Sequence, residues 1–186
     1  DQIASYNDKV LTVRNLNSDT TCTLKLTNEI TSLYEDGTLI INEQGLDKAS
    51  NLEKHGKVIN SYDAMNAGNS YSFDATSQIW KGERDLIKSV EVGKTLKPVD
   101  TSYWFYDLRN LEKVDLTNLD TSKVRYMMGM FKYAGYDVSN FSLSLASLDT
   151  SSVKSINNMF MYAGYNADVF TLNLSSWNLS NLSSMD

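Results

Sequence analysis

Few residues of this chain could do chemistry, and they are scattered. His55 is the single histidine and Cys22 the single cysteine, so neither a metal site nor a nucleophile–histidine pair has an evident set of partners. Glu35 and Asp36 are adjacent carboxylates, but they precede Gly37 in a turn signal that explains them without catalysis. His55 is expected on the surface, at the end of a short helix. Without a phosphate loop or a nucleophile elbow, we expect no enzyme, no cofactor and no metal.

Four tyrosines recur at fixed spacing and are candidate ligand-binding residues. Tyr133 and Tyr136 flank an Ala-Gly dipeptide, and Tyr162 and Tyr165 flank the same dipeptide further on. If these segments lie side by side, the rings form two short columns. Aromatic columns can bind sugars or proteins, because each ring offers apolar area with a polar tip. They can also pad loops against one another, and both interpretations remain open.

These tyrosines belong to a repeat of 29 residues. The segment 114–142 aligns without a gap on 143–171, and a third, partial copy covers 172–186. Self-similarity at this period is typical of stacked units that bury each other's apolar faces. We therefore expect an α+β fold in which a β-rich, non-repeating cap (residues 1–100) precedes a short leucine-rich-repeat-like β/α solenoid (residues 101–186). A degenerate copy is expected near 101–113.

Within each copy the pattern predicts a strand followed by a helix. Alternating apolar residues give strands that begin at Val114, Leu143 and Leu172 and pair in parallel. Apolar offsets of three and seven residues predict helices over 124–131 and 153–160, with another over 102–108 in the degenerate copy. Lys123, Arg125 and Lys132 are then one solvated helix face.

The outward-facing strand residues are the second candidate binding surface. Strand side chains alternate between two faces, so the polar members of each strand point away from the core. This face is small and polar, without an aromatic anchor. It is either a docking surface or merely solvated, and its candidate ligand-binding residues are Asp115, Thr117, Ser144, Asn173 and Ser175.

A column of Asp120, Asp149 and Asn178 recurs once per copy. Calcium requires six to eight converging oxygens, which one residue per copy does not supply. Helix capping accounts for the two aspartates better.

The first hundred residues predict strands and one helix. Strands are expected over 10–16, 22–27, 71–73 and 87–92. Residues 33–41 contain Asp36-Gly37 between two apolar runs and predict a hairpin. Residues 46–55 predict a short helix that ends at Gly56.

Composition excludes some partners. With 17 basic and 23 acidic residues the net charge is −6, which argues against nucleic-acid binding. No stretch approaches the ~20 apolar residues of a membrane helix. The chain opens at Asp1 without an initiator Met, so we expect an upstream targeting segment to have been removed. The incomplete third copy predicts that the chain continues, or that its last repeat self-associates.

The repeats resemble those of the BspA-like leucine-rich-repeat proteins of bacteria. The resemblance covers roughly residues 33–186 and is carried by 104–106, 111–116, 119–124, Met130-Phe131, and the leader segments 34–39, Trp80 and 87–90. It implies a secreted or cell-surface protein, often described as an adhesin. The Tyr-Ala-Gly-Tyr turn and Asn178-Leu179-Ser180 depart from the common pattern.

These observations favour an extracellular or bacterial cell-surface module that binds a protein or glycan of a host or neighbouring cell. The rival hypothesis is a structural spacer or assembly subunit without a ligand of its own.

Overall fold

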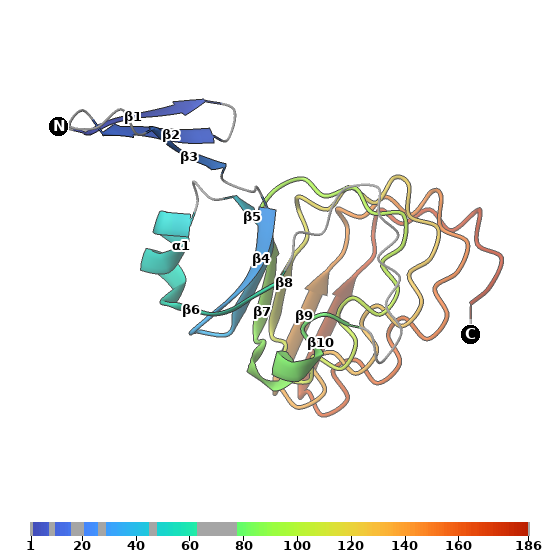
Figure 1. Ribbon diagram of the computed structural model, residues 1–186. Coiled ribbons are helices and arrows are strands. Elements are labelled where there is room, and N and C mark those ends of the chain that lie inside the picture. Colours follow the sequence, from blue (N-terminus) through green and yellow to red (C-terminus); the bar gives the residue numbers. More distant parts are fainter. Residues whose placement is uncertain are drawn as a thin grey trace.

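The computed structural model describes residues 2–7, 10–15, 21–25, 29–44, 48–62 and 78–185. Strands dominate the fold, with one α-helix and one 3₁₀-helix among the described elements (Figure 1). In chain order the elements are β1 (Gln2–Asn7), β2 (Val10–Asn15), β3 (Thr21–Lys25), β4 (Glu29–Tyr34), β5 (Thr38–Gln44), α1 (Lys48–His55), β6 (Val58–Tyr62), η1 (Lys81–Leu86), β7 (Ser89–Val92), β8 (Lys113–Asp115), β9 (Asn140–Ser144) and β10 (Val169–Asn173).

The strands form three sheets. β1, β2 and β3 make an antiparallel sheet, and β9 and β10 a parallel pair. The largest sheet has the order β6-β4-β5-β7-β8, antiparallel at its first three strands and parallel from β5 onward. Strands predicted over 10–16 and 22–27 are confirmed as far as those residues are described, and the strand predicted over 87–92 is present as β7, which begins at Ser89. The strand predicted over 71–73 lies outside the described residues.

The hairpin predicted over 33–41 is confirmed. β4 and β5 pair antiparallel with Leu33 opposite Leu39, and both side chains are buried. In the turn, the N–H of Thr38 donates to Oδ1 of Asp36 at 2.9 Å. Gly37 has φ +89°, and a Cβ there would lie 2.5 Å from the carbonyl oxygen of Leu86. The turn therefore requires glycine for both its conformation and its close approach to the chain beside it.

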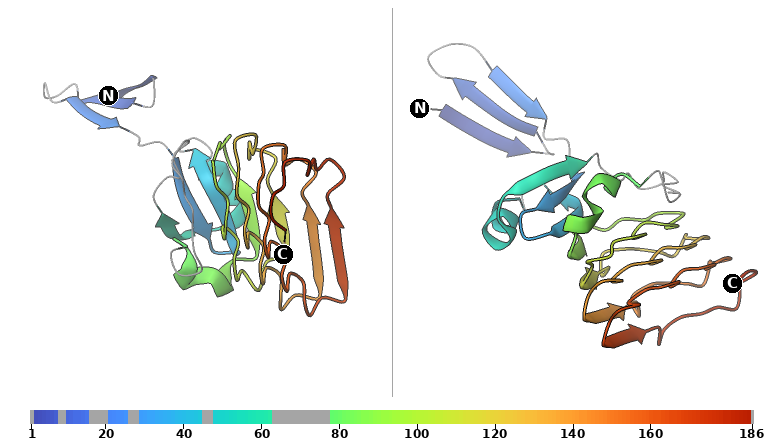
Figure 2. Two further views of the ribbon diagram at one scale, coloured as in Figure 1. Left: turned by 90° about the vertical axis from the view of Figure 1, so that its right-hand side faces the viewer. Right: turned by 90° about the horizontal axis from the view of Figure 1, so that it is seen from below.

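The repeat copies pair with each other in parallel, as the sequence predicts. Each residue of β9 pairs with the residue 29 positions later in β10, as Phe141 does with Phe170. A second line of parallel bridges joins Tyr126 to Ser155 and Ser155 to Ser184. Figure 2 shows this part of the chain as successive loops lying side by side. Equivalent side chains are thereby brought next to one another.

The predicted fold class is wrong: the chain is a mixed, sheet-dominated fold and not a β/α solenoid. The segments 102–108, 124–131 and 153–160, expected as helices, consist of turns and extended chain without an α-helix. Every second N–H between 127 and 133 leaves its own copy and donates to the next one, at 2.9 to 3.0 Å. A helix would have used those groups internally. The donors Met127, Gly129, Phe131 and Tyr133 are paired with the carbonyl oxygens of Ser155, Asn157, Met159 and Met161.

The core follows this pairing. Phe131 packs between Phe105 and Phe160, with ring centroids 5.2 and 6.1 Å apart, and Phe160 in turn contacts Trp177. Phe141 stacks on Phe170 at 5.5 Å. The apolar residues at helix-like offsets are thus buried as expected, except that Phe160 is only partly buried, although the backbone that carries them is not helical. Neither helix among the described residues is long and apolar enough to cross a bilayer.

Replacing Gly135 with alanine should destabilise the fold strongly. Its φ is +61°, and an added Cβ would lie 2.5 Å from the ring of Phe141. Conformational strain and overpacking together should cost about 2–4 kcal/mol of unfolding free energy, measured by urea titration. Gly82→Ala is the matched control, because a Cβ at Gly82 meets nothing within 4 Å. Equal effects of the two substitutions would contradict this account.

Phe131→Ala should cost about 3–5 kcal/mol of unfolding free energy, because the ring is fully buried and a cavity remains. Phe170→Ala should cost much less, since 41% of that residue is exposed. Thermal and urea unfolding of both variants tests the difference. A near-neutral Phe131→Ala would show that the packing between copies contributes little.

Candidate functional site

The four tyrosines predicted as candidates come together and form what we call the tyrosine ladder: Tyr133, Tyr136, Tyr162 and Tyr165. Tyr133 stacks on Tyr162 and Tyr136 on Tyr165, each pair with ring centroids 5.1 Å apart and ring planes within 11° of parallel. Within each copy the two rings also touch, at 5.9 and 5.5 Å. The two predicted columns therefore exist and form one continuous aromatic surface.

Backbone bonds between the copies align these rings. The N–H of Tyr133 donates to the carbonyl of Met161, and the N–H of Asn166 donates to the carbonyl of Tyr136. Tyr133 and Tyr162 both have positive φ, at 61° and 59°. This conformation is uncommon for a bulky residue. Its recurrence at the same position of both copies orients the two rings alike.

A cation closes one end of the ladder. The guanidinium of Arg109 lies 4.0 Å from the ring centre of Tyr136, on the column that continues to Tyr165. Its Nε also binds Oδ2 of Asp137 at 2.7 Å, and this hydrogen bond lowers the pKa of the Asp137 carboxyl. A second cation, Lys132, lies 5.5 Å from the Tyr133 ring. Cations at such distances are attracted to an aromatic face.

Sequence reasoning missed Arg109. Its carbonyl accepts the N–H of Asp137, just as the carbonyl of Tyr136 accepts the N–H of Asn166. Arg109 thus occupies, in the degenerate copy, the position of the second ladder tyrosine. Between its two positions equivalent to the ladder tyrosines, the degenerate copy lacks the glycine that the other copies have. A gapless alignment of the repeats could therefore not show that Arg109 is equivalent to Tyr136.

The ladder is accessible to a ligand. Tyr133 and Tyr136 are half-buried, whereas 43% of Tyr162 and 61% of Tyr165 is exposed. A polar hollow of about 580 Å³ adjoins it through Asp137, the partner of Arg109. The hollow offers carboxylate, amide, hydroxyl and ammonium groups from Lys88, Asn110, Glu112, Asp137, Ser139 and Asn140. Aromatic faces beside such groups can bind the faces and hydroxyls of a sugar.

The candidate residues on the strand face are exposed, but two of their polar side chains accept hydrogen bonds from the nearby backbone. Asp115 accepts the N–H of Thr117 at 3.0 Å, and Asn173 accepts the N–H of Ser175 at 3.1 Å. Hydrogen bonds from Thr117 also lower the pKa of the Asp115 carboxyl. Ser144 lies opposite Asn173 in the parallel pair of β9 and β10. These residues form local turns and a polar strip without an aromatic side chain among them.

The recurring Asp120, Asp149 and Asn178 form turns and not helix caps. Each side-chain oxygen accepts the N–H two residues later, at 2.9 to 3.1 Å. This is the Asx-turn geometry, so the predicted local bond exists but no helix follows it. Among the residues that the structure describes, no three acidic, histidine or cysteine side chains gather as a metal site would require.

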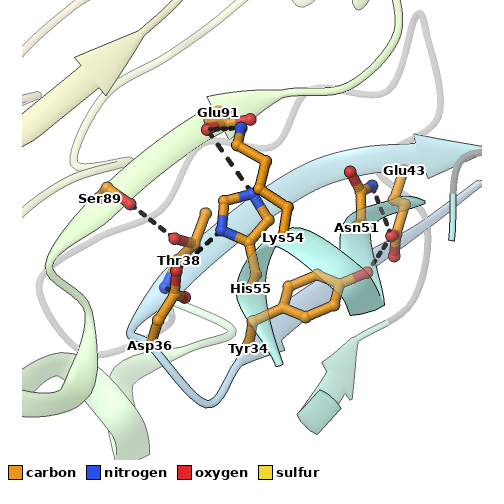
Figure 3. A network of polar contacts seen from close by, with 9 residues as sticks. All are labelled: Tyr34, Asp36, Thr38, Glu43, Asn51, Lys54, His55, Ser89 and Glu91. Atoms are coloured by element: carbon orange, nitrogen blue, oxygen red, sulfur yellow. Dashed lines mark hydrogen bonds and ion pairs between the residues drawn. The ribbon is translucent and has the colours of Figure 1, made fainter. Parts of the chain in front are cut away.

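His55 is buried, contrary to the expectation of a surface residue. Its Nδ1 lies 2.8 Å from Oδ2 of Asp36, and its Nε2 lies 3.9 Å from Glu91 (Figure 3). Burial alone would raise the pKa of Asp36, but the hydrogen bonds of that carboxylate with His55 and Thr38 lower it. The interaction ties the end of α1 to the β4–β5 turn.

A second buried pair lies beside it. The hydroxyl of Tyr34 donates to Oε1 of Glu43, which also accepts a hydrogen bond from Asn51 at 2.8 Å (Figure 3). Burial, and then the neighbouring Glu43 carboxylate, raises the pKa of Tyr34. Within the described part of the chain, the polar contacts of the His55 ring are with the carboxylates of Asp36 and Glu91.

Acid should weaken the fold through Asp120. Its hydrogen bond from Lys97, and then those from Ser122, lower its pKa to about 2 from 3.8. The folded state binds this proton less readily than the unfolded state. The contribution of Asp120 to stability is therefore present above about pH 4 and is lost as the pH falls towards 2.

Thermal unfolding of wild type and Asp120→Asn between pH 2 and 6 measures this loss. The difference in Tm should be largest at pH 5–6 and vanish near pH 2. Asp149→Asn is the matched control: Asp149 forms the same turn, but its lowered pKa comes from Ser151 without a lysine partner. Its pH dependence should be weaker, and equal curves would contradict the role of Lys97.

Comparison with known proteins gives one match. Residues 74–186 match the family described as "Mycoplasma protein of unknown function, DUF285". The chain matched no curated protein and no solved structure. The family match covers more than half of the chain, including both complete repeats and the tyrosine ladder. By this match, the chain belongs to the DUF285 family.

Proposed function

We propose that this protein is a recognition module of a bacterial cell surface and that the tyrosine ladder binds a glycan. The observation that carries the proposal is the pair of stacked, accessible tyrosine columns beside a polar hollow. The similarity of the repeats to BspA-like surface proteins supports the extracellular location and the adhesive role. A protein surface with complementary aromatic groups is the other ligand class that such a ladder fits.

The ladder supports glycan binding through the geometry of its faces. Tyr165 presents the most exposed ring, and its neighbour Tyr162 lies 5.5 Å away at an angle of 67°. A sugar ring can lie on the one face while its hydroxyls reach the hydroxyl of the other. Asp137 and Asn166, bonded to each other at 3.3 Å, add an acceptor and a donor at the side of the ladder.

Binding to immobilised glycans and extracellular-matrix proteins tests the proposal. Tyr165→Ala should weaken any saturable interaction with a neutral glycan about tenfold, which corresponds to about 1.4 kcal/mol. The variant should stay folded, because most of this side chain is exposed. A quadruple alanine variant of the ladder should abolish the binding of neutral glycans.

Leu86→Ala and Ile59→Ala are the matched controls, since both remove an exposed apolar side chain outside the ladder. They should bind as wild type does. An interaction with a neutral glycan that survives the loss of all four tyrosines, in a variant with a cooperative unfolding transition, would exclude the ladder as the binding face.

A second candidate is a spacer or assembly subunit. Val169 and Phe170 of β10 are 55% and 41% exposed, so this strand could pack against a second copy of the chain. Light scattering over a concentration series distinguishes the two functions. The assembly function would be favoured if the chain associates, if Phe170→Asp removes this association, and if no immobilised glycan or matrix protein is bound.

A further inference from the structure

A second hollow, lined on one side by cations, shares no residue with the tyrosine ladder. It encloses about 520 Å³ and is lined by Val99, Asp100, Ser122, Lys123, Arg125, Tyr126 and Ser152. The side chains of Lys123 and Arg125 are exposed. Tyr126, which also lines the hollow, is 41% exposed. The lining thus combines positive charge with an accessible aromatic ring.

Pairing between the copies places a third cation, Lys154, beside the lining residue Arg125. Tyr126 bridges Ser155 in parallel, and the N–H of Lys154 donates to the carbonyl of Arg125 at 2.8 Å. Arg125 and Lys154 therefore occupy equivalent positions on chains that run about 4.8 Å apart. Like charges placed side by side in this way repel each other.

Lys123, Arg125 and Lys154 form no ion pair within the described part of the chain. The nearby Asp120 is already paired with Lys97 at 2.6 Å. Asp100 lines the hollow but is buried, and its Oδ1 accepts the N–H of Ser102 at 2.7 Å. The lining therefore carries two cations and one carboxylate, an excess of one positive charge, on a chain whose net charge is −6.

We propose that this hollow binds an acidic polysaccharide through its sulfate or carboxylate groups. Arg125 and Lys154 contact neighbouring anionic groups, Lys123 contributes a third charge, and Tyr126 packs against a sugar face. An arginine fork matches the geometry of both sulfate and carboxylate oxygens. Bound anions also relieve the repulsion between Arg125 and Lys154, so the hollow should bind acidic sugars more tightly than neutral ones.

A polysaccharide fits better than a nucleic acid. Binding to a phosphate backbone gains its affinity from many simultaneous cation–phosphate contacts. This hollow supplies two cations, with Lys154 beside Arg125, on an otherwise acidic protein. A few charges beside one exposed ring are a better match to a sugar chain that carries occasional acidic groups.

Calorimetric titration with four probes tests the proposal: a heparin hexasaccharide, an oligogalacturonate, neutral maltohexaose and a dT oligonucleotide. In the quadruple tyrosine variant, which lacks the ladder, either acidic sugar should bind and the neutral one should not, and binding should weaken as NaCl rises from 50 to 300 mM. The two acidic probes distinguish sulfate from carboxylate. Tighter binding of the oligonucleotide than of both acidic sugars would overturn the proposal in favour of a nucleic-acid site.

Two variants with equal charge change locate the site. Arg125→Gln/Lys154→Gln should reduce affinity for the acidic sugar at least tenfold, since charge-assisted contacts are lost. Lys57→Gln/Lys113→Gln removes two exposed charges elsewhere and should bind as wild type does. Equal losses in both variants, or no binding of either acidic sugar to the folded wild type, would refute the proposal.

The ladder variant separates this proposal from the preceding one. The quadruple tyrosine variant leaves Tyr126 and the three cations in place, so it should retain the acidic sugar. Loss of acidic-sugar binding in that variant, at unchanged Tm, would place the site on the ladder and not in this hollow.

Discussion

The structure depends on the hydrogen bonds that alternate peptide groups make to the neighbouring repeat copy. The N–H groups of Gly129 and Phe131 bind carbonyl oxygens 28 residues further along the chain. The N–H groups between them close turns within the copy, as that of Met130 does with the carbonyl of Met127. Both sets of polar groups are satisfied without a helix. Every column of equivalent side chains, aromatic or charged, is a consequence of this arrangement.

The sequence allowed the pairing to be predicted, but not the backbone that achieves it. Phe141 and Phe170 hold the same position in successive copies, which predicted that their segments lie side by side in parallel. Asp36-Gly37 predicted the hairpin. The prediction of helices was wrong because turns of three and four residues place apolar side chains at almost the same offsets as a helix does. Periodicity reports which residues are buried, and it cannot distinguish two backbones that bury the same ones.

The candidate sites also differ in whether the sequence allowed them to be predicted. The ladder tyrosines could be predicted, because each has an equivalent in an aligned copy. His55 could not, because its partner Asp36 lies 19 residues earlier and is brought near only by the packing of α1 on the β4–β5 hairpin. The cationic hollow could not be predicted for a related reason. Arg125 and Lys154 belong to different copies, and the sequence predicted Arg125 on a solvated helix face with Lys123 and Lys132.

Arg109 makes the potential along the tyrosine ladder uneven. A guanidinium lies over Tyr136, and its electrostatic influence weakens with distance along the column towards Tyr165. The stack therefore has an electrostatic direction. An elongated molecule lying along it meets a different potential at each terminus, so a chain whose two ends differ chemically binds preferentially in one orientation, and the surface distinguishes a sequence of groups from its reverse.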